Sequence, residues 1–177
     1  TTLYRENTQM NKQVDSYCYI DGITKRIIKS WIDLEPEREI PWTPLDRPLA
    51  ECTIALISSG GIALKTDQPF DQECERQNPW CGDHTFRRIP LTARAQDIKL
   101  YHLHVDPTFV EQDINCLLPV GRLAELADAG EIGRAAEVHY SFMGYNLQPE
   151  ALLEQTTPAI IASLQDEGVD AVVLIPA

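Results

Sequence analysis

The chain has 177 residues, of which 44% are hydrophobic, which suits a single domain with a core of ordinary size. Fifteen Lys plus Arg against 27 Asp plus Glu give a formal net charge of -12. This charge repels phosphate backbones and anionic lipid surfaces, so we expect no nucleic acid and no membrane as partner. The apolar runs are strand-sized, and residues 1–11 lack the apolar segment of a signal peptide. The composition therefore predicts a cytoplasmic protein.

Residues 1–45 are predicted to form an N-terminal helix and an extended lead-in. Apolar side chains recur at helical spacing from Ile20 to Ile32, which favours an amphipathic helix that packs on the domain. Pro41 and Pro44 each disfavour helical backbone in the residue before them, so the lead-in should be extended. The main domain is then expected over residues 46–177.

The main domain shows strand and helix signals in alternation. Apolar runs of strand length occur at 53–57, 98–103, 136–142 and 171–175. Helices are predicted from Pro119 to Gly130 and from Pro149 to Gly168, with Pro158 either bending the second helix or starting a new one. This order predicts an α/β fold with a doubly wound, largely parallel sheet of the Rossmann or flavodoxin-like type. We expect the rest of a longer chain or a partner protein to cover the last strand. We also expect the protein to be an oligomer.

The five cysteines form no CxxC pair, and no export signal indicates an oxidising compartment, so reduced thiols are expected. Cys52 and Cys116 lie in apolar runs and are predicted to be buried. Cys74 and Cys81 lie in a polar loop where they can pair, but their spacing matches no common zinc or redox motif. We interpret both as bystanders.

The turn after the first predicted strand is a candidate binding site. Ser58, Ser59, Gly60 and Gly61 offer hydroxyl groups and a backbone that a ligand can approach closely, which favours an anion or a carboxylate. The alternative is a purely structural turn. The segment is neither GxGxxG nor a P-loop, so a nucleotide is not supported.

His102, His104 and Asp106 follow the second predicted strand. Alternation along a strand would place all three on one face, at the edge where parallel sheets bind ligands. One interpretation is acid/base catalysis or substrate hydrogen bonding by a histidine. Another is a metal site, which needs further ligands that the sequence does not identify. The third is that these side chains cap the loop into Pro107.

Other segments can form the wall of the same pocket. Asp83 lies in a charged loop, and Phe142 and Gly144 end the third predicted strand, where core packing is the alternative. Asp113 and Asn115 precede the helix at Pro119, and we expect them to satisfy backbone donors rather than bind a ligand.

Short segments from about Pro41 to Ala177 occur in the order found in a known family. They are Trp42 to Leu45, Cys52 to Gly61, Gly82-Asp83 with Phe86-Arg87, His102, Asp113 to Asn115, Glu131 to Gly133, Ser141 to Tyr145 and Glu167 to Leu174. Together they resemble the family containing selenoprotein B of the glycine, sarcosine and betaine reductases and the selenoprotein subunit of D-proline reductase.

The resemblance implies a reductase whose nucleophile lies outside this sequence. In that family the strand corresponding to Val172 to Ala177 is followed by a selenocysteine or cysteine and, three positions on, a second cysteine. A selenolate or thiolate then attacks a carbon next to a carbonyl, and thiols regenerate it. We therefore expect no cofactor within residues 1–177, a selenocysteine or cysteine pair just beyond Ala177, a small-molecule substrate and a thiol reductant. The sequence would then be a trimmed chain, one stopped at a selenocysteine codon, or one cleaved at a cysteine.

On this interpretation His102 and His104 are the acid/base candidates. Substrate binding is assigned to Ser58, Ser59, Gly60, Gly61, Asp83, Asp106, Phe142 and Gly144. The loop from Cys74 to Arg88 departs from the family pattern, so the substrate and leaving group do not follow from the resemblance. Two alternatives are a non-catalytic subunit or small-molecule binding protein on the same fold, and a metal-dependent hydrolase using His102, His104 and Asp106.

Overall fold

The computed structural model describes residues 20–34, 36, 39, 43–78, 81–144, 146 and 149–177, in two units, Thr1–Thr43 and Pro44–Ala177. The first unit contains helix α1 (Gly22–Leu34), which confirms the predicted helix. Asp21 caps it, because its Oδ1 accepts hydrogen bonds from the backbone N–H groups of Ile23 and Thr24 at 2.8 and 3.0 Å. None of the side chains of α1 is buried, and its packing on the second unit stays a prediction. Residues 40–42 of the predicted lead-in, including Pro41, lie outside the described residues.

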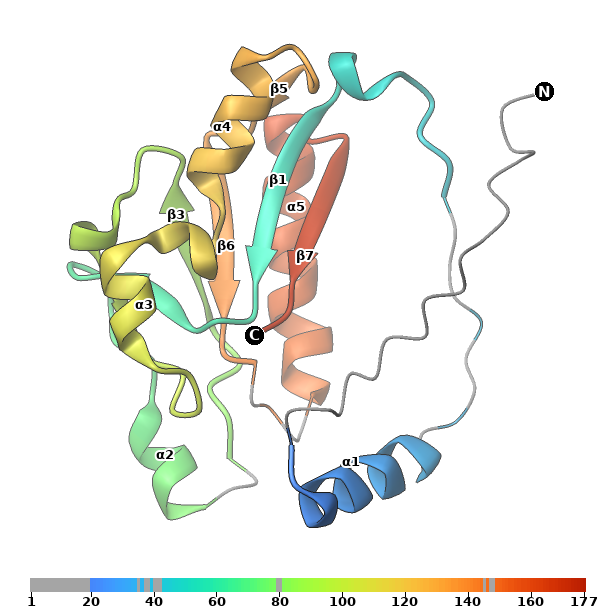
Figure 1. Cartoon of the computed structure of the whole chain (residues 1–177). Coiled ribbons are helices and arrows are strands. Elements are labelled where there is room, and N and C mark those ends of the chain that lie inside the picture. The colour runs from blue at the N-terminus through green and yellow to red at the C-terminus, as the bar shows by residue number, and fades with distance from the viewer. Residues whose placement is uncertain are drawn as a thin grey trace. The chain divides into compact units, whose positions relative to one another are not determined.

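The second unit is built on a curled, largely parallel sheet (Figure 1). Strand β1 (Thr53–Ser58) pairs in parallel with β7 (Ala171–Ile175) along one edge. Along its other edge β1 pairs in parallel with β5 (Arg134–Ala135) and then β6 (Val138–Phe142). Strand β3 (Phe86–Pro90) adds an antiparallel edge next to β6. The protein therefore has a mixed α/β fold, as predicted.

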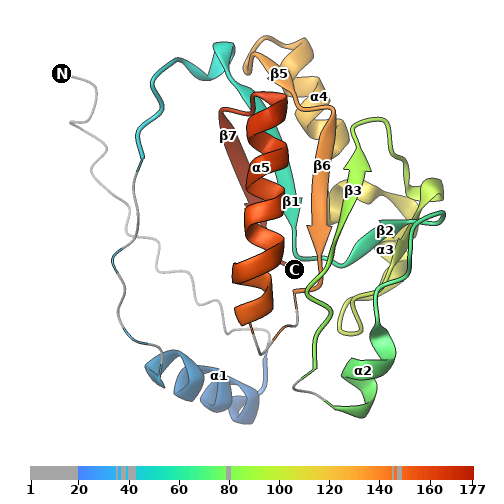
Figure 2. The same cartoon turned by 180° about the vertical axis from the view of Figure 1, so that it is seen from behind.

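Helices cover both faces of this sheet (Figures 1 and 2). Helix α4 (Val120–Asp128) lies on one face and α5 (Thr157–Glu167) on the other. Successive β1 side chains point to opposite faces, so Ile54 and Leu56 join the core cluster under α4, whereas Ala55 joins the one under α5. Burial on both faces explains why β1 has a nearly continuous apolar sequence.

The predicted strand at 98–103 does not belong to the parallel sheet. Strand β4 (Ile98–Leu100) pairs antiparallel with β2 (Ile62–Leu64) in a separate two-stranded sheet. The prediction was wrong because a short apolar run reports burial but not its pairing partner. Helix α3 (Pro107–Gln112) packs against β4, and α2 (Gln72–Gln77) is hydrogen-bonded through Gln72 to the segment after β4. In the described part of the chain, 3₁₀ turns occupy Leu49–Glu51, Ala95–Asp97 and Ile114–Cys116.

The helix predicted from Pro149 to Gly168 contains a wide turn. A π-helical segment (Leu152–Thr156) leads into α5, whose first turn contains Pro158. Proline has no backbone N–H, so it cannot donate to the preceding turn, and the hydroxyl of Thr157 donates to the carbonyl of Leu152 at 3.0 Å. Gly168, with φ of +71°, ends α5 in the left-handed conformation.

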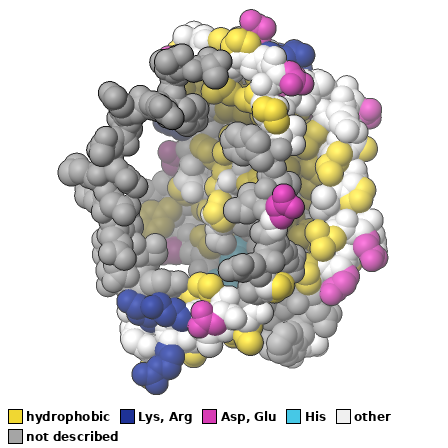
Figure 3. All heavy atoms as spheres, turned by 90° about the vertical axis from the view of Figure 1, so that its right-hand side faces the viewer, with side chains coloured by type: hydrophobic (Ala, Val, Ile, Leu, Met, Phe, Trp, Pro, Cys, Tyr) yellow, Lys and Arg dark blue, Asp and Glu magenta, His cyan; other side chains and the backbone are white. Residues whose placement is uncertain are grey.

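The far edge of β7 faces outward. Among the described strands β7 pairs with β1 alone, and Val173 and Leu174 are 48% and 71% exposed. Figure 3 looks onto this side of the molecule, where hydrophobic side chains lie at the surface. No helix in the described part of the chain is long and apolar enough to cross a membrane.

The His139 side chain replaces part of the backbone hydrogen bonding between β1 and the neighbouring strands β5 and β6. Ile54 pairs with Ala135, but Ile57 pairs with Tyr140, so two extra residues lie on the β5/β6 side. Between these pairs the backbone N–H of Leu56 donates to Nδ1 of His139 at 3.1 Å. His139 is fully buried, and this burial lowers its pKa to about 4.

Acid should therefore destabilise the fold through His139. The unfolded chain binds a proton near the ordinary pKa of 6.5, whereas the folded chain does so only near pH 4. The free energy of unfolding should thus fall by about 2 kcal/mol between pH 7 and pH 5 because of this residue. The His139→Asn variant keeps an acceptor for Leu56 but does not titrate, so its urea unfolding should lose about 2 kcal/mol less over this range. Equal losses in both proteins would contradict the assignment.

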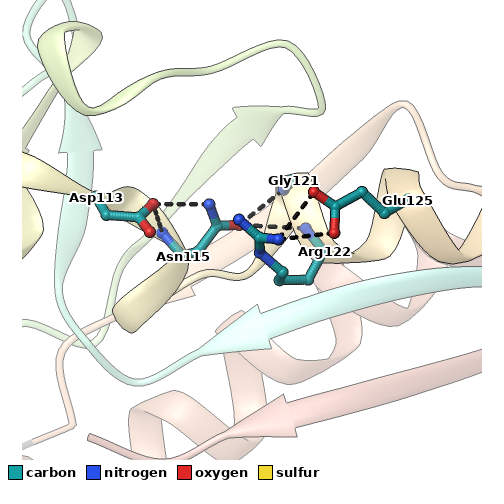
Figure 4. Close-up of polar contacts among 5 residues, drawn as sticks. All are labelled: Asp113, Asn115, Gly121, Arg122 and Glu125. Atoms are coloured by element: carbon teal, nitrogen blue, oxygen red, sulfur yellow. Dashed lines mark hydrogen bonds and ion pairs between the residues drawn. The ribbon is translucent and has the colours of Figure 1, made fainter.

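The start of α4 is stabilised by a side chain from an earlier segment (Figure 4). Pro119 occupies the N-cap position and provides no side-chain acceptor. Instead Oδ1 of Asn115 accepts from the backbone N–H groups of Gly121 and Arg122 at 2.9 and 3.3 Å, and its Nδ2 donates to Asp113 at 2.7 Å. The structural role predicted for Asp113 and Asn115 is therefore confirmed.

Removing this cap should be measurable against a neighbouring control. Asn115→Ala should lower the free energy of unfolding by about 1 kcal/mol, because two backbone donors at the helix start lose their acceptor. Arg122→Ala removes only the surface ion pair with Glu125, whose two side chains are each 62% exposed, so its loss should be below about 0.5 kcal/mol. Urea unfolding of both variants tests the difference, and equal losses would refute the capping role.

Candidate functional site

The candidate site lies where the carboxyl ends of β1 and β7 meet the turn from Ser58 to Gly61. The backbone N–H of Ser59 donates to the carbonyl of Ile175 at 3.0 Å. In return, the hydroxyl of Ser59 accepts from the backbone N–H of Ala177 at 2.9 Å. The segment after β7 is thus attached to the turn, at the sheet edge where open α/β proteins bind ligands.

The turn itself is closely packed. The hydroxyl oxygen of Ser58, which is fully buried, accepts from the N–H of Gly60 at 3.0 Å. Gly61 has φ of +60°, and a Cβ atom there would lie 2.5 Å from the sulfur of Met143. A Cβ atom on Gly144 would lie 2.7 Å from the carbonyl oxygen of Ser59. Glycine is therefore required at Gly144 by the nearby backbone of Ser59, and it is favoured at Gly61 by the positive φ.

His102 lies directly beside this turn. The backbone N–H of Tyr101 donates to the carbonyl of Gly61 at 2.8 Å, which positions the next residue against it. The His102 side chain is buried, and its Nδ1 accepts from the backbone N–H of His104 at 3.2 Å. Burial, reinforced by the charge of His104, lowers the pKa of His102. Near neutral pH its proton is therefore on Nε2, where it can be donated.

A carboxylate that sequence reasoning missed lies next to His104. Oε1 of Glu75, on α2, is 3.2 Å from Nε2 of His104, while the two side chains are 4% and 61% exposed. The contact is not an aligned hydrogen bond, since that oxygen has no hydrogen-bond partner in the described structure, and it becomes an ion pair when His104 is protonated. The His102 and His104 rings are 5.8 Å apart. No spacing in the sequence links Glu75 to these histidines.

The remaining predicted residues make other contacts. Strand β4 ends at Leu100, so the argument that His102, His104 and Asp106 alternate on one strand face was wrong. Asp106 caps α3, accepting from the N–H of Thr108 at 2.9 Å. Asp83 accepts from the N–H of Asp71 at 2.8 Å, and Phe142 lines an apolar groove beside α5. Within the described residues no three His, Cys, Asp or Glu side chains are grouped as a metal site would require.

The cysteines differ from the prediction in two ways. Cys74 and Cys81 form a disulfide with a Cα–Cα distance of 5.6 Å, so the expectation that all thiols are reduced was wrong. Cys116 is exposed rather than buried, because it ends a 3₁₀ turn where its thiol donates to the carbonyl of Asp113 at 3.0 Å. The burial of Cys52 is confirmed. Burial and the nearby charge of Asp113 raise the pKa of Cys116, which does not favour a reactive thiolate.

Comparison with known proteins identifies relatives for nearly the whole chain. Residues 6–177 match the model of the family described as glycine/sarcosine/betaine reductase selenoprotein B. D-proline reductase subunit gamma of Acetoanaerobium sticklandii is 35% identical over 133 residues, which are 75% of this chain and 52% of that protein. Glycine reductase complex component B subunit gamma of Carboxydothermus hydrogenoformans is 32% identical over 136 residues, 76% of this chain and 30% of that protein.

A third relative belongs to a further reductase complex. Betaine reductase complex component B subunit beta of Peptoclostridium acidaminophilum is 25% identical over 162 residues, 87% of this chain and 36% of that protein. No solved structure matches the chain. The chain thus spans between about a third and about half of the length of these relatives, which are components of reductase complexes. It belongs to the glycine/sarcosine/betaine reductase selenoprotein B family.

Proposed function

We propose that this chain forms the substrate-binding part of a thiol- or selenol-dependent reductase. The enzyme would reductively cleave a bond at a carbon next to a carbonyl, using a selenocysteine or cysteine pair that follows Ala177 in a longer protein. Its electrons would come from a thiol, and it would act in the cytoplasm as one subunit of a complex. Family membership and the reductase names of the relatives support this proposal.

One observation carries the proposal. The hydroxyl of Ser59 accepts from the backbone N–H of Ala177, so residues following Ala177 would start at the turn that His102 adjoins. A nucleophile there would lie at the carboxyl edge of two parallel strands. If a helix followed, its N-terminus would lower the pKa of the thiol or selenol and favour the reactive anion.

The chemistry divides between the nucleophile and His102. The sulfur or selenium anion forms a bond to the substrate carbon while the bond from that carbon to an amine or another leaving group breaks. Nε2 of His102 carries a proton in the neutral ring and is suited to donate a hydrogen bond to the departing group or to a carbonyl oxygen, which would stabilise the charge that develops there as the bond breaks. One thiolate of a dithiol then attacks the sulfur or selenium, the bond from that atom to the carbon breaks, and the carbon takes up a proton. The second thiol of the dithiol displaces the nucleophile as its anion, so the dithiol becomes a disulfide and the nucleophile is regenerated.

The turn supports substrate binding in this scheme. Gly60 and Gly61 bring backbone close to the reacting region without side chains, which suits a carboxylate or carbonyl oxygen. The Ser58 hydroxyl oxygen already accepts within the turn, so its binding role would be limited to its remaining hydrogen-bonding capacity. The exposed edge of β7 would be covered by another part of the complex or by the longer chain.

Paired substitutions at His102 test this mechanism. In the longer protein, with dithiothreitol as electron donor and a panel of amino-acid and betaine substrates, His102→Asn should lower kcat/KM by about 10²- to 10⁴-fold. Asn keeps an acceptor in place of Nδ1 but has no donor in place of Nε2, whereas Gln restores a donor there. His102→Gln should therefore retain more activity than His102→Asn.

Cys116→Ser is the control, because this exposed thiol contacts no residue of the proposed mechanism. It should leave kcat/KM unchanged. Full activity in His102→Asn would remove the donor role of His102. If no thiol-dependent cleavage occurred and the segment after Ala177 held neither selenocysteine nor cysteine, the chain would instead be a non-catalytic binding subunit.

A further inference from the structure

Helix α2 depends on contacts outside itself. It has six residues, too few to be stable alone. Asp71 caps it by accepting from the N–H groups of Glu73 and Cys74, both at 3.0 Å. The Gln72 side chain donates to the carbonyl of Tyr101 at 2.5 Å. The Cys74–Cys81 disulfide links the helix covalently to the segment that follows it. Removing this link would therefore weaken a marginal element.

Glu75, the residue after Cys74, has a buried carboxyl group next to the site. The side chain of Glu75 is 4% exposed, and burying a carboxylate is costly unless a partner compensates it. The basic side chain within ion-pair distance of it is His104, on the loop that also presents His102, and the two form an ion pair when His104 is protonated. Because Cys74 and Glu75 are adjacent, the position of the carboxylate depends on the position of α2. The disulfide thus bears on the electrostatics of both histidines.

The bridge is also accessible to a small thiol. Cys74 and Cys81 are both only partly buried, unlike Cys52, which is fully buried. A thiolate can therefore attack one sulfur of the bridge, which is the first step of thiol–disulfide exchange. The second thiol of a dithiol then completes the exchange.

We propose that the Cys74–Cys81 disulfide is a thiol-reducible switch that, when closed, holds Glu75 against His104. A dithiol opens it by exchange: the dithiol becomes a disulfide, and Cys74 and Cys81 become two thiols, with two electrons and two protons transferred. Opening frees α2 and moves the Glu75 carboxylate away from His104. That the switch regulates activity rests on the proposed function, in which a thiol supplies the electrons. The effect of the disulfide on the position of Glu75 does not rest on it.

The first measurement establishes the bridge and its reducibility in the native chain. Trypsin cleaves after Lys65, Arg76 and Arg87, so peptides 66–76 and 77–87 should remain joined without reductant. If dithiothreitol is added to the folded protein and free thiols are then alkylated, the two peptides should separate with one alkyl group each. Separate peptides before reduction, or a bridge that survives excess dithiothreitol in the native state, would overturn the proposal.

The second measurement follows the consequence of opening. Hydrogen exchange of the amides of Cys74 and Asn78 should accelerate by about tenfold or more on reduction, because the loop constraint is lost. The ring signals of His104 in the NMR spectrum of histidine-labelled protein should shift on reduction. Those of His139, buried in the sheet, should not, which separates a local change from unfolding. Unchanged His104 signals would overturn the coupling.

Substitutions separate the effect of the disulfide on the His104 signals from the effect of the Glu75 carboxyl group. The double variant Cys74→Ser with Cys81→Ser should show the reduced-state signals of His104 without reductant and should not respond to dithiothreitol. Glu75→Gln should shift the His104 signals even with the bridge closed. Glu73→Gln, an exposed neighbour on the same helix, should not. A double variant that still responds to dithiothreitol, or equal shifts in the two glutamate variants, would refute the proposal. None of these readouts needs activity, so they stand apart from a failure of the proposed reductase.

Discussion

The parallel pairing of β1 with β7 is the constraint on which the candidate site depends. Five residues of each strand are in register from Ile54 with Ala171 to Ser58 with Ile175, so both strands end at the same level. Only this common ending allows Ser59 to bind the backbone at Ile175 and Ala177. Any group that follows β7 in a longer chain would therefore start at the turn after β1. The two strands are more than a hundred residues apart in sequence. The chain between them passes His102, which lies against the same turn.

Close packing around the turn makes this arrangement rigid. Gly61 lies against the Met143 side chain, and Gly144 lies so close to the backbone of Ser59 that a side chain has no room there. The three segments after β1, β4 and β6 are thus held by backbone contacts, and His102 is positioned by the strand that precedes it. Such backbone-built positions suit a site whose geometry must be fixed within a fraction of an ångström. The side chains of Glu75 and His104 lie in the same region and contact each other through their ionisable groups.

The sequence predicts the parts of the fold that local pattern controls. The structure contains three features of this kind: the strand predicted from the apolar run of β1, the helix stop at Gly130 and the irregular helix near Pro158. Each depends on the residues of one short segment. Pairing partners are not local, so the run at Ile98 was placed in the wrong sheet. The same limit applies to the site. The turn at Gly61 was proposed as a site from its own residues, and His102 lies beside it through a backbone contact rather than through the predicted strand face. Glu75 meets His104 through tertiary contact alone, and the spacing of Cys74 and Cys81 matches no common motif.

We propose that, in a longer protein, the segment after Ala177 carries a nucleophile to the turn at Ser59. The most direct measurement is alkylation of the longer native protein with a limiting amount of iodoacetate near neutral pH, followed by peptide mapping. The first alkyl group should be found on a cysteine or selenocysteine within the first few residues after Ala177, ahead of exposed Cys116. Alkylation of Cys116 first, with the segment after Ala177 unmodified, would contradict it.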